Sequence, residues 1–196
     1  SIHYFFENEI TLRTILQNIS DNLKIGGSFV GTSFDGKRVF ELLKGMKKPA
    51  EGFIEDKLLW KITKKYSART FNEDKPNLGL KIENMINTIG LSHEEYLVNY
   101  KYFVEIAKEY GLKMKKIRGF GEIFESIESD NEHYSKLQEM SAAEKQFSFL
   151  HNEFIFEKTE NASDKVYGKL ITLINKADKK KEKLGKLNKN NRIKIV

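Results

Sequence analysis

Histidine, cysteine and carboxylate side chains are the usual metal ligands, and this sequence spaces them in a way that argues against a zinc centre. It contains no cysteine, so neither a disulfide nor a thiolate site can form. The four histidines lie far apart and show no ligand spacing: His3, His93, His133 and His151. We therefore expect chemistry that needs no metal, and we assign no metal ligand.

The positive charge of the chain is concentrated near its C-terminal end. The net charge is +6, and residues 175–196 hold nine Lys or Arg residues against Asp178 and Glu182, which leaves residues 1–174 at about −1. Such a segment binds RNA phosphates through counterion release or only keeps a protein soluble, and both readings stay open. No apolar run reaches the roughly 20 residues of a membrane helix, and no signal peptide is visible, so we expect a soluble intracellular protein.

The N-terminal part of the sequence alternates between strand and helix patterns. Residues 1–6 read as the end of an apolar strand. Apolar residues at helical spacing predict a helix from Glu9 to Leu23, which the glycines at 26–27 end. Residues 28–32 predict a buried parallel strand, and residues 39–43 predict another helix. This order of elements predicts an α/β fold.

A stretch of alternating apolar and charged residues interrupts this order. Residues 58–66 and 78–86 predict an exposed antiparallel pair of strands, within an inserted segment at about 52–90. Aromatic residues at alternating strand positions are typical of packing, so we assign no site role to Trp60, Tyr66 or Phe71.

The C-terminal half begins with a strong helical pattern. It predicts a helix from His93 or Glu94 to Tyr110, with Ser92 as N-cap and Gly111 as its end. Further elements are predicted as a strand at 112–117, a helix at 131–145 and a strand at 147–156. Residues 159–196 are expected to form a polar helix and a basic, flexible end.

Four segments share a pattern in order and spacing: His3-Tyr4-x-Phe6-Glu7, Leu23-Lys24-x-Gly26-Gly27-x-Phe29-x-Gly31-Thr32, Glu95-Tyr96-Leu97-Val98, and Phe120-x-x-Ile123-Phe124-Glu125. Through them the chain resembles the mRNA cap (guanine-N7) methyltransferases over residues 1–158. The version of the second segment that runs from Thr32 to Lys37 resembles the capping enzymes of large DNA viruses.

The resemblance implies a class I S-adenosyl-methionine-dependent methyltransferase with a Rossmann-like sheet. This chain would be the C-terminal portion of that domain, carrying a β insertion. The family binds S-adenosyl-methionine largely through an acidic, glycine-rich loop, which is absent from this sequence, so we expect the 196 residues to be inactive alone. Ser1 and Tyr4 fall where the family contacts the cofactor.

The resemblance also implies a site for the cap guanine. Glu95 falls at the position of the guanine-edge glutamate, and His3 and Tyr4 fall where the family lines the pocket between guanine and methyl donor. Phe34 stands where many members have proline, and His151 where many have tyrosine; both would offer flat faces. Without the resemblance, Glu95 reads as an ordinary solvated acid, and Phe34 and His151 as packing residues.

The implied reaction is methyl transfer from S-adenosyl-methionine to N7 of the guanosine cap of mRNA. N7 carries a free lone pair, so the reaction depends on orientation, and we assign no catalytic residue. Implied partners are the capped mRNA 5′ end, upstream triphosphatase and guanylyltransferase domains and a stimulatory subunit; a viral protein would act in the viral factory, host cytoplasm or virion. Two alternatives stay open: a class I methyltransferase with another substrate, and a non-catalytic RNA-binding or subunit-contact module.

Overall fold

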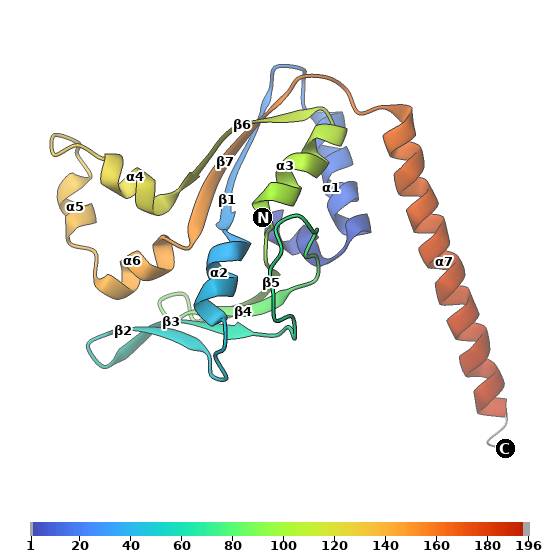
Figure 1. Cartoon of the computed structure of the whole chain (residues 1–196), viewed down its shortest axis with the longest axis horizontal. Helices are drawn as coiled ribbons and strands as arrows, with labels where there is room; N and C mark the ends of the chain where they lie inside the picture. Colours follow the sequence, from blue (N-terminus) through green and yellow to red (C-terminus); the bar gives the residue numbers. More distant parts are fainter. Residues whose placement is uncertain (1, 194–196) are drawn as a thin grey trace.

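A computed structural model describes residues 2–193, which form a mixed α/β fold with two antiparallel sheets (Figure 1). The first sheet consists of β1 (Ser28–Phe34), β6 (Leu112–Gly119) and β7 (His151–Lys158), in the order β1-β7-β6. Gly31 lies opposite Phe154 across the β1–β7 pairing, and a Cβ at Gly31 would lie 2.6 Å from the phenyl ring. The ring therefore occupies the space that any side chain at this position would need.

Helical elements pack on the first sheet and form its core. They are η1 (Ile2–Glu7, a 3-10 helix), α1 (Glu9–Asn22) and α3 (Tyr100–Glu109). Aromatic rings fill much of this core: the ring centroids of Phe103 and Phe156 are 4.7 Å apart, and Phe6 packs edge-on against Phe103. The buried ammonium group of Lys158 donates to the carbonyl of Leu23 at 2.7 Å, where it also complements the dipole at the end of α1.

The second sheet has four antiparallel strands in chain order. They are β2 (Ala50–Ile54), β3 (Lys57–Lys64), β4 (Lys81–Ile86) and β5 (Leu91–Tyr96), with α2 (Gly36–Leu43) packed against them. The core centres on Trp60, which is 1% exposed and whose indole N–H donates to the Ala143 carbonyl at 2.9 Å. Tyr66 and Phe71 pack against the same core. The β3–β4 pair confirms the predicted antiparallel pairing, and the three aromatic residues serve packing as expected. The prediction that this pair is exposed is wrong, because Trp60, Ile62 and Ile82 are buried in the core.

An arm of three short helices joins β6 to β7: α4 (Phe120–Ser126), α5 (Tyr134–Gln138) and α6 (Ala142–Ser148). Figure 1 shows the arm reaching away from the first sheet before it returns toward the second, where α6 contacts β2 and β3. The last element is α7 (Asp164–Ile193), which stands out from the rest of the molecule in Figure 1. The predicted polar helix and basic end thus fall largely within one helix. Within residues 2–193, no helix is both long and apolar enough to span a bilayer.

Two predictions about the N-terminal part are wrong. Residues 2–7 form η1 rather than a strand end, because a helical turn brings Ile2 and Phe6 together in the core of the first sheet. The strand at 28–34 pairs antiparallel rather than parallel, and it is not buried along its length, since Val30 is 61% exposed. Its described neighbour is β7, which returns from the arm in the opposite direction.

The helix predicted from residue 93 or 94 to Tyr110 is instead a strand followed by a shorter helix. Residues 91–96 pair with β4 as β5, so Ser92 is not an N-cap. Asn99 caps α3, and its carbonyl accepts the Phe103 N–H at 2.9 Å. Pairing with a neighbouring strand decides the conformation of this polar segment.

The helix predicted at 131–145 is interrupted. Ser141 and Glu144 form a capping box, in which each side chain accepts the backbone N–H of the other residue. This box starts α6 as a new helix after α5.

Candidate functional site

One pocket brings together all five side chains that the sequence predicts for guanine binding. Its volume is about 290 Å³, near the lower end for small-molecule sites. Its lining comes from η1, the end of β1, strands β4 and β5, and the α6–β7 junction: His3, Tyr4, Thr32, Ser33, Phe34, Asn84, Ile86, His93, Glu95, Phe147 and His151. Ser1, the other predicted cofactor contact, lies outside the described residues.

The carboxylate of Glu95 is the only acidic group among the lining residues. It lies on β5 opposite Ile82 of β4 and is 5% exposed. Its Oε2 lies 3.0 Å from Nε2 of His3, within ion-pair distance, whereas its buried Oε1 has no hydrogen-bond partner among the described residues. A buried carboxylate oxygen without a donor is unfavourable, so this site is suited to a ligand that supplies N–H groups.

Aromatic rings form the wall beside this carboxylate. Phe34 and His151 face each other across the β1–β7 pairing and stack at a centroid distance of 4.2 Å and an angle of 29°. Phe147 meets both rings edge-on, at 5.4 Å from Phe34 and 5.2 Å from His151. The wall is therefore flat, apolar and already packed.

The hydrogen bonds of His151 define its tautomer. Its Nδ1 lies 3.1 Å from the carbonyl oxygens of Phe147 and Ser148, so Nδ1 carries the hydrogen and Nε2 of the neutral ring is an acceptor. Burial lowers the pKa of His151 below its ordinary value, while the two backbone carbonyls and the charge of Glu95 oppose this effect. The neutral ring is consequently the favoured form in the folded protein.

The depressed pKa of His151 predicts a loss of stability in mild acid. The unfolded chain takes up a proton near pH 6.5 while the folded ring resists it, so this contribution is present above pH 6.5 and is lost as the pH falls through the lower pKa of the folded state. We expect wild type to lose more free energy of unfolding between pH 7.5 and 5.5 than His151→Asn, whose amide donates but does not titrate. Equal losses in urea titrations of the two proteins would contradict this expectation.

A polar network holds the two strand ends that carry Phe34 and His151. Asp35 caps α2 by accepting the Lys37 N–H at 3.0 Å, and its other oxygen accepts from the Asn152 amide at 3.0 Å. Arg38 donates to the Asn152 oxygen at 3.1 Å. These bonds fix the end of β1 against the start of β7, directly beside the pocket.

Tyr4 occupies the open side of the pocket. It is 44% exposed, and its ring centroid lies 4.3 Å from that of His3. The described lining fits S-adenosyl-methionine only in part: Tyr4 gives it one flat wall, but Glu95 is the only lining carboxylate and is bound to His3. No cluster of three potential metal ligands occurs within the part of the chain that the structure describes.

Sequence reasoning missed several lining residues, among them Asn84 and His93, and the wrong assignment of β5 explains why His93 was missed. His93 and Glu95 point to one face of β5, and Asn84 and Ile86 to the same face of β4. The alternation of these positions is a usable signal only once both segments are recognised as strands. A helix through residues 93–95 hides it.

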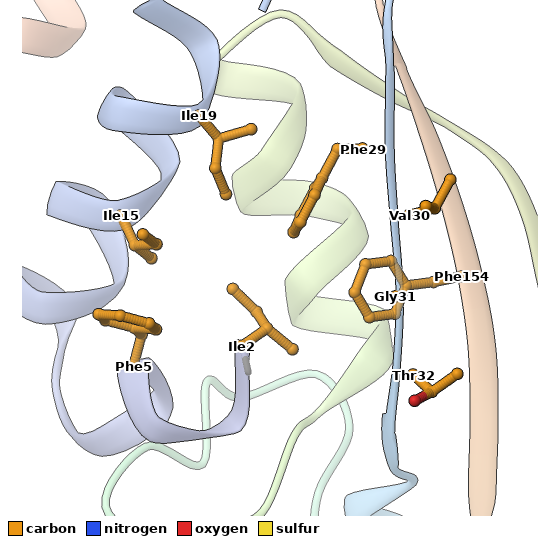
Figure 2. Close-up of a pocket in the computed structure, with 9 residues that line it drawn as sticks. All are labelled: Ile2, Phe5, Ile15, Ile19, Phe29, Val30, Gly31, Thr32 and Phe154. Carbon is orange, nitrogen blue, oxygen red and sulfur yellow. The ribbon is translucent and has the colours of Figure 1, made fainter. Parts of the chain in front are cut away.

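A second cleft, of about 330 Å³, lies between η1, α1 and β1, and Figure 2 shows its lining. Its walls are almost entirely apolar: Ile2, Phe5, Ile15, Ile19, Phe29, Val30, Gly31, Thr32 and Phe154. The hydroxyl of Thr32 is the only polar side-chain group drawn there (Figure 2). The side chains of this cleft therefore offer few polar groups that could orient a ligand.

Comparison with known proteins agrees with the chemistry of the pocket. A sequence model of the mRNA (guanine-N(7))-methyltransferase domain matches residues 1–192. The chain is 29% identical over 137 residues to a probable mRNA-capping enzyme of Acanthamoeba polyphaga mimivirus, covering 66% of this chain and 11% of that protein. It is 28% identical over 140 residues to the mRNA cap guanine-N(7) methyltransferase of Meyerozyma guilliermondii, covering 63% and 22%. It is 28% identical over 129 residues to the Saccharomyces cerevisiae protein of that name, covering 63% of this chain and 29% of that protein. The chain thus spans less than a third of each of these relatives.

Proposed function

The chain belongs to the mRNA (guanine-N7)-methyltransferase domain family, and from this premise we propose that it binds the guanosine cap of mRNA for methyl transfer from S-adenosyl-methionine to N7. The protein would act as part of an mRNA-capping enzyme, as the name of the mimivirus relative suggests. Residues 1–158 would be the C-terminal part of the methyltransferase domain, with an insertion at about 52–90.

One observation carries the proposal: a buried carboxylate with an unpartnered oxygen lies beside a flat aromatic wall. Guanine presents N1–H and an N2 amino group on one edge, whereas adenine presents an acceptor at N1. Glu95 would accept from the guanine edge, and His3 would hold the carboxylate through its bond to Oε2. Phe34 and His151 would form the wall against which the base lies.

Methyl transfer to N7 places modest demands on the protein. The nucleophile is a lone pair that needs no deprotonation, so the residues contribute by fixing the base in line and by excluding water. S-adenosyl-methionine supplies the activated methyl group when bound. Tyr4, which is 44% exposed, would line the pocket where the base meets the donor and contact both, and Ser1 would be a further cofactor contact.

The wider assembly follows from the same proposal. The mimivirus relative is named a probable mRNA-capping enzyme and extends far beyond the matched segment, which is compatible with triphosphatase and guanylyltransferase domains in the same polypeptide here. The capped 5′ end of mRNA would be the substrate, and a stimulatory subunit is a further expected partner. If the protein is viral, it would act in the viral factory, the host cytoplasm or the virion.

Tyr4 offers a test of base stacking that does not disturb the core. Base stacking on an aromatic side chain contributes roughly 1–3 kcal/mol, so Tyr4→Ala should lower kcat/KM for capped RNA by roughly 5-fold to 150-fold. Tyr4→Phe keeps the ring and should stay within about threefold of wild type. Unchanged kcat/KM in Tyr4→Ala would remove Tyr4 from the site.

The function itself is tested by the product. The full-length protein is incubated with labelled S-adenosyl-methionine and guanosine-capped RNA, and the RNA is then digested to nucleosides. We expect the label in 7-methylguanosine, and none with uncapped RNA. Label in another nucleoside or only in protein would favour a methyltransferase with a different substrate, and RNA binding without transfer would favour the non-catalytic module.

A further inference from the structure

Asn84 occupies a buried position in the middle of the second sheet. It lies on β4, with Ile62 of β3 on one side and His93 of β5 on the other. Its side chain is 8% exposed and lines the pocket of Glu95. An amide at such a position in a sheet is unfavourable unless its polar atoms find partners.

The Asn84 oxygen has no partner within the described protein. Only four buried side-chain polar atoms of the described residues lack one, and two of them, Asn84 Oδ1 and Glu95 Oε1, belong to the lining of this pocket. The other two belong to Gln17 and Arg118, which do not line it. Both orphaned atoms in the pocket are acceptors, so the pocket lacks hydrogen-bond donors that a ligand could supply.

The guanine edge supplies enough donors for both of these acceptors. It carries three hydrogens, one on N1 and two on N2. Glu95 has one oxygen bound to His3 and one free, so its free oxygen cannot alone take all three in good geometry. Resting on the proposed function, we infer that Asn84 accepts a hydrogen bond from the N2 amine and is a specificity-determining residue for guanine.

The amine is the group that distinguishes guanine from hypoxanthine. The two bases share N1–H, O6 and N7, and hypoxanthine lacks only the N2 amine. An RNA with an inosine cap therefore removes the proposed partner of Asn84 and leaves the bond from N1 to Glu95 and the methyl acceptor in place. Asn84→Leu removes the acceptor from the protein while it keeps a similar volume.

The test measures kcat/KM for methyl transfer to the guanosine cap and to the inosine cap, for wild type and for Asn84→Leu, in the full-length protein. We expect wild type to prefer the guanosine cap by roughly tenfold or more, because the inosine cap leaves the Asn84 oxygen without a hydrogen-bond donor. In Asn84→Leu this preference should fall to within about twofold, chiefly through loss of activity on the guanosine cap. Because the ratio is measured within one preparation, the fraction of folded protein cancels, and Asn84→Ala gives a second reading if the leucine variant folds poorly.

Two other outcomes overturn the inference in different ways. If both caps lose activity equally, so that the ratio stays at the wild-type value, Asn84 supports the fold and does not contact the amine. If wild type transfers methyl to neither cap, the proposed function fails, and the role of Asn84 fails with it.

Discussion

Replacing Glu95 by alanine should lower kcat/KM for guanosine-capped RNA by about 30-fold or more. The change removes a buried charged acceptor and leaves the Nε2–H of His3 without its partner. Removing a buried charged acceptor from the donors that it would bind costs roughly 2–5 kcal/mol. Because Glu95 would bind the guanine of the cap, this loss of binding energy lowers kcat/KM for transfer to the cap.

Glu94 is the matched control for this experiment. It precedes Glu95 on β5, so its side chain points to the opposite face, where it is 58% exposed and bonds to Lys81 at 3.2 Å. Exposed ion pairs contribute little, so Glu94→Ala should leave kcat/KM within about twofold of wild type. Equal losses in the two variants would mean that the effect comes from the net charge or from β5 rather than from the pocket.

Trp60→Ala should lower the free energy of unfolding by about 3–5 kcal/mol, the usual cost of removing a large buried aromatic side chain. The indole fills the core of the second sheet, and Gly52 lies against it so closely that a Cβ there would be 2.1 Å from the indole nitrogen. The variant also leaves the Ala143 carbonyl without its donor. Chemical denaturation followed by far-ultraviolet circular dichroism measures the change without a tryptophan signal.

Phe53→Ala on the neighbouring strand is the control for Trp60. Phe53 is about half exposed, so its truncation should change the free energy of unfolding by less than about 0.5 kcal/mol. A Trp60→Ala protein with wild-type stability and weakened RNA binding would contradict the assignment of this residue to packing.

Local patterns predicted those elements whose buried face can be recognised from the spacing of apolar residues. The helix at 9–22 and the strand at 112–119 lie within a few residues of their expected bounds, because α1 buries Leu12 and Leu16 at helical spacing and Gly111 stops the preceding helix with φ +72°. The prediction for residues 91–96 was wrong because pairing with β4 decides which of these side chains are buried. Leu91, Ser92 and His93 are exposed or polar, and only the pairing reveals that Glu95 faces inward.

The candidate site divides in the same way. The resemblance to a family selected His3, Tyr4, Phe34, Glu95 and His151, and the fold places all five around one pocket although they come from four separate segments. Asn84 and His93 carry no motif, and their place in the pocket depends on the register of β4 and β5. Sequence reasoning therefore reached the residues that a family pattern marks and missed those that strand pairing alone brings in.

The most direct test of the central claim is a crystal structure of the full-length protein with a guanosine cap dinucleotide. The account predicts that the guanine lies in the pocket between Glu95 and the Phe34–His151 wall, with N1 or N2 within hydrogen-bond distance of Glu95 Oε1. A dinucleotide bound elsewhere, with Glu95 Oε1 making no contact to the base, would contradict it.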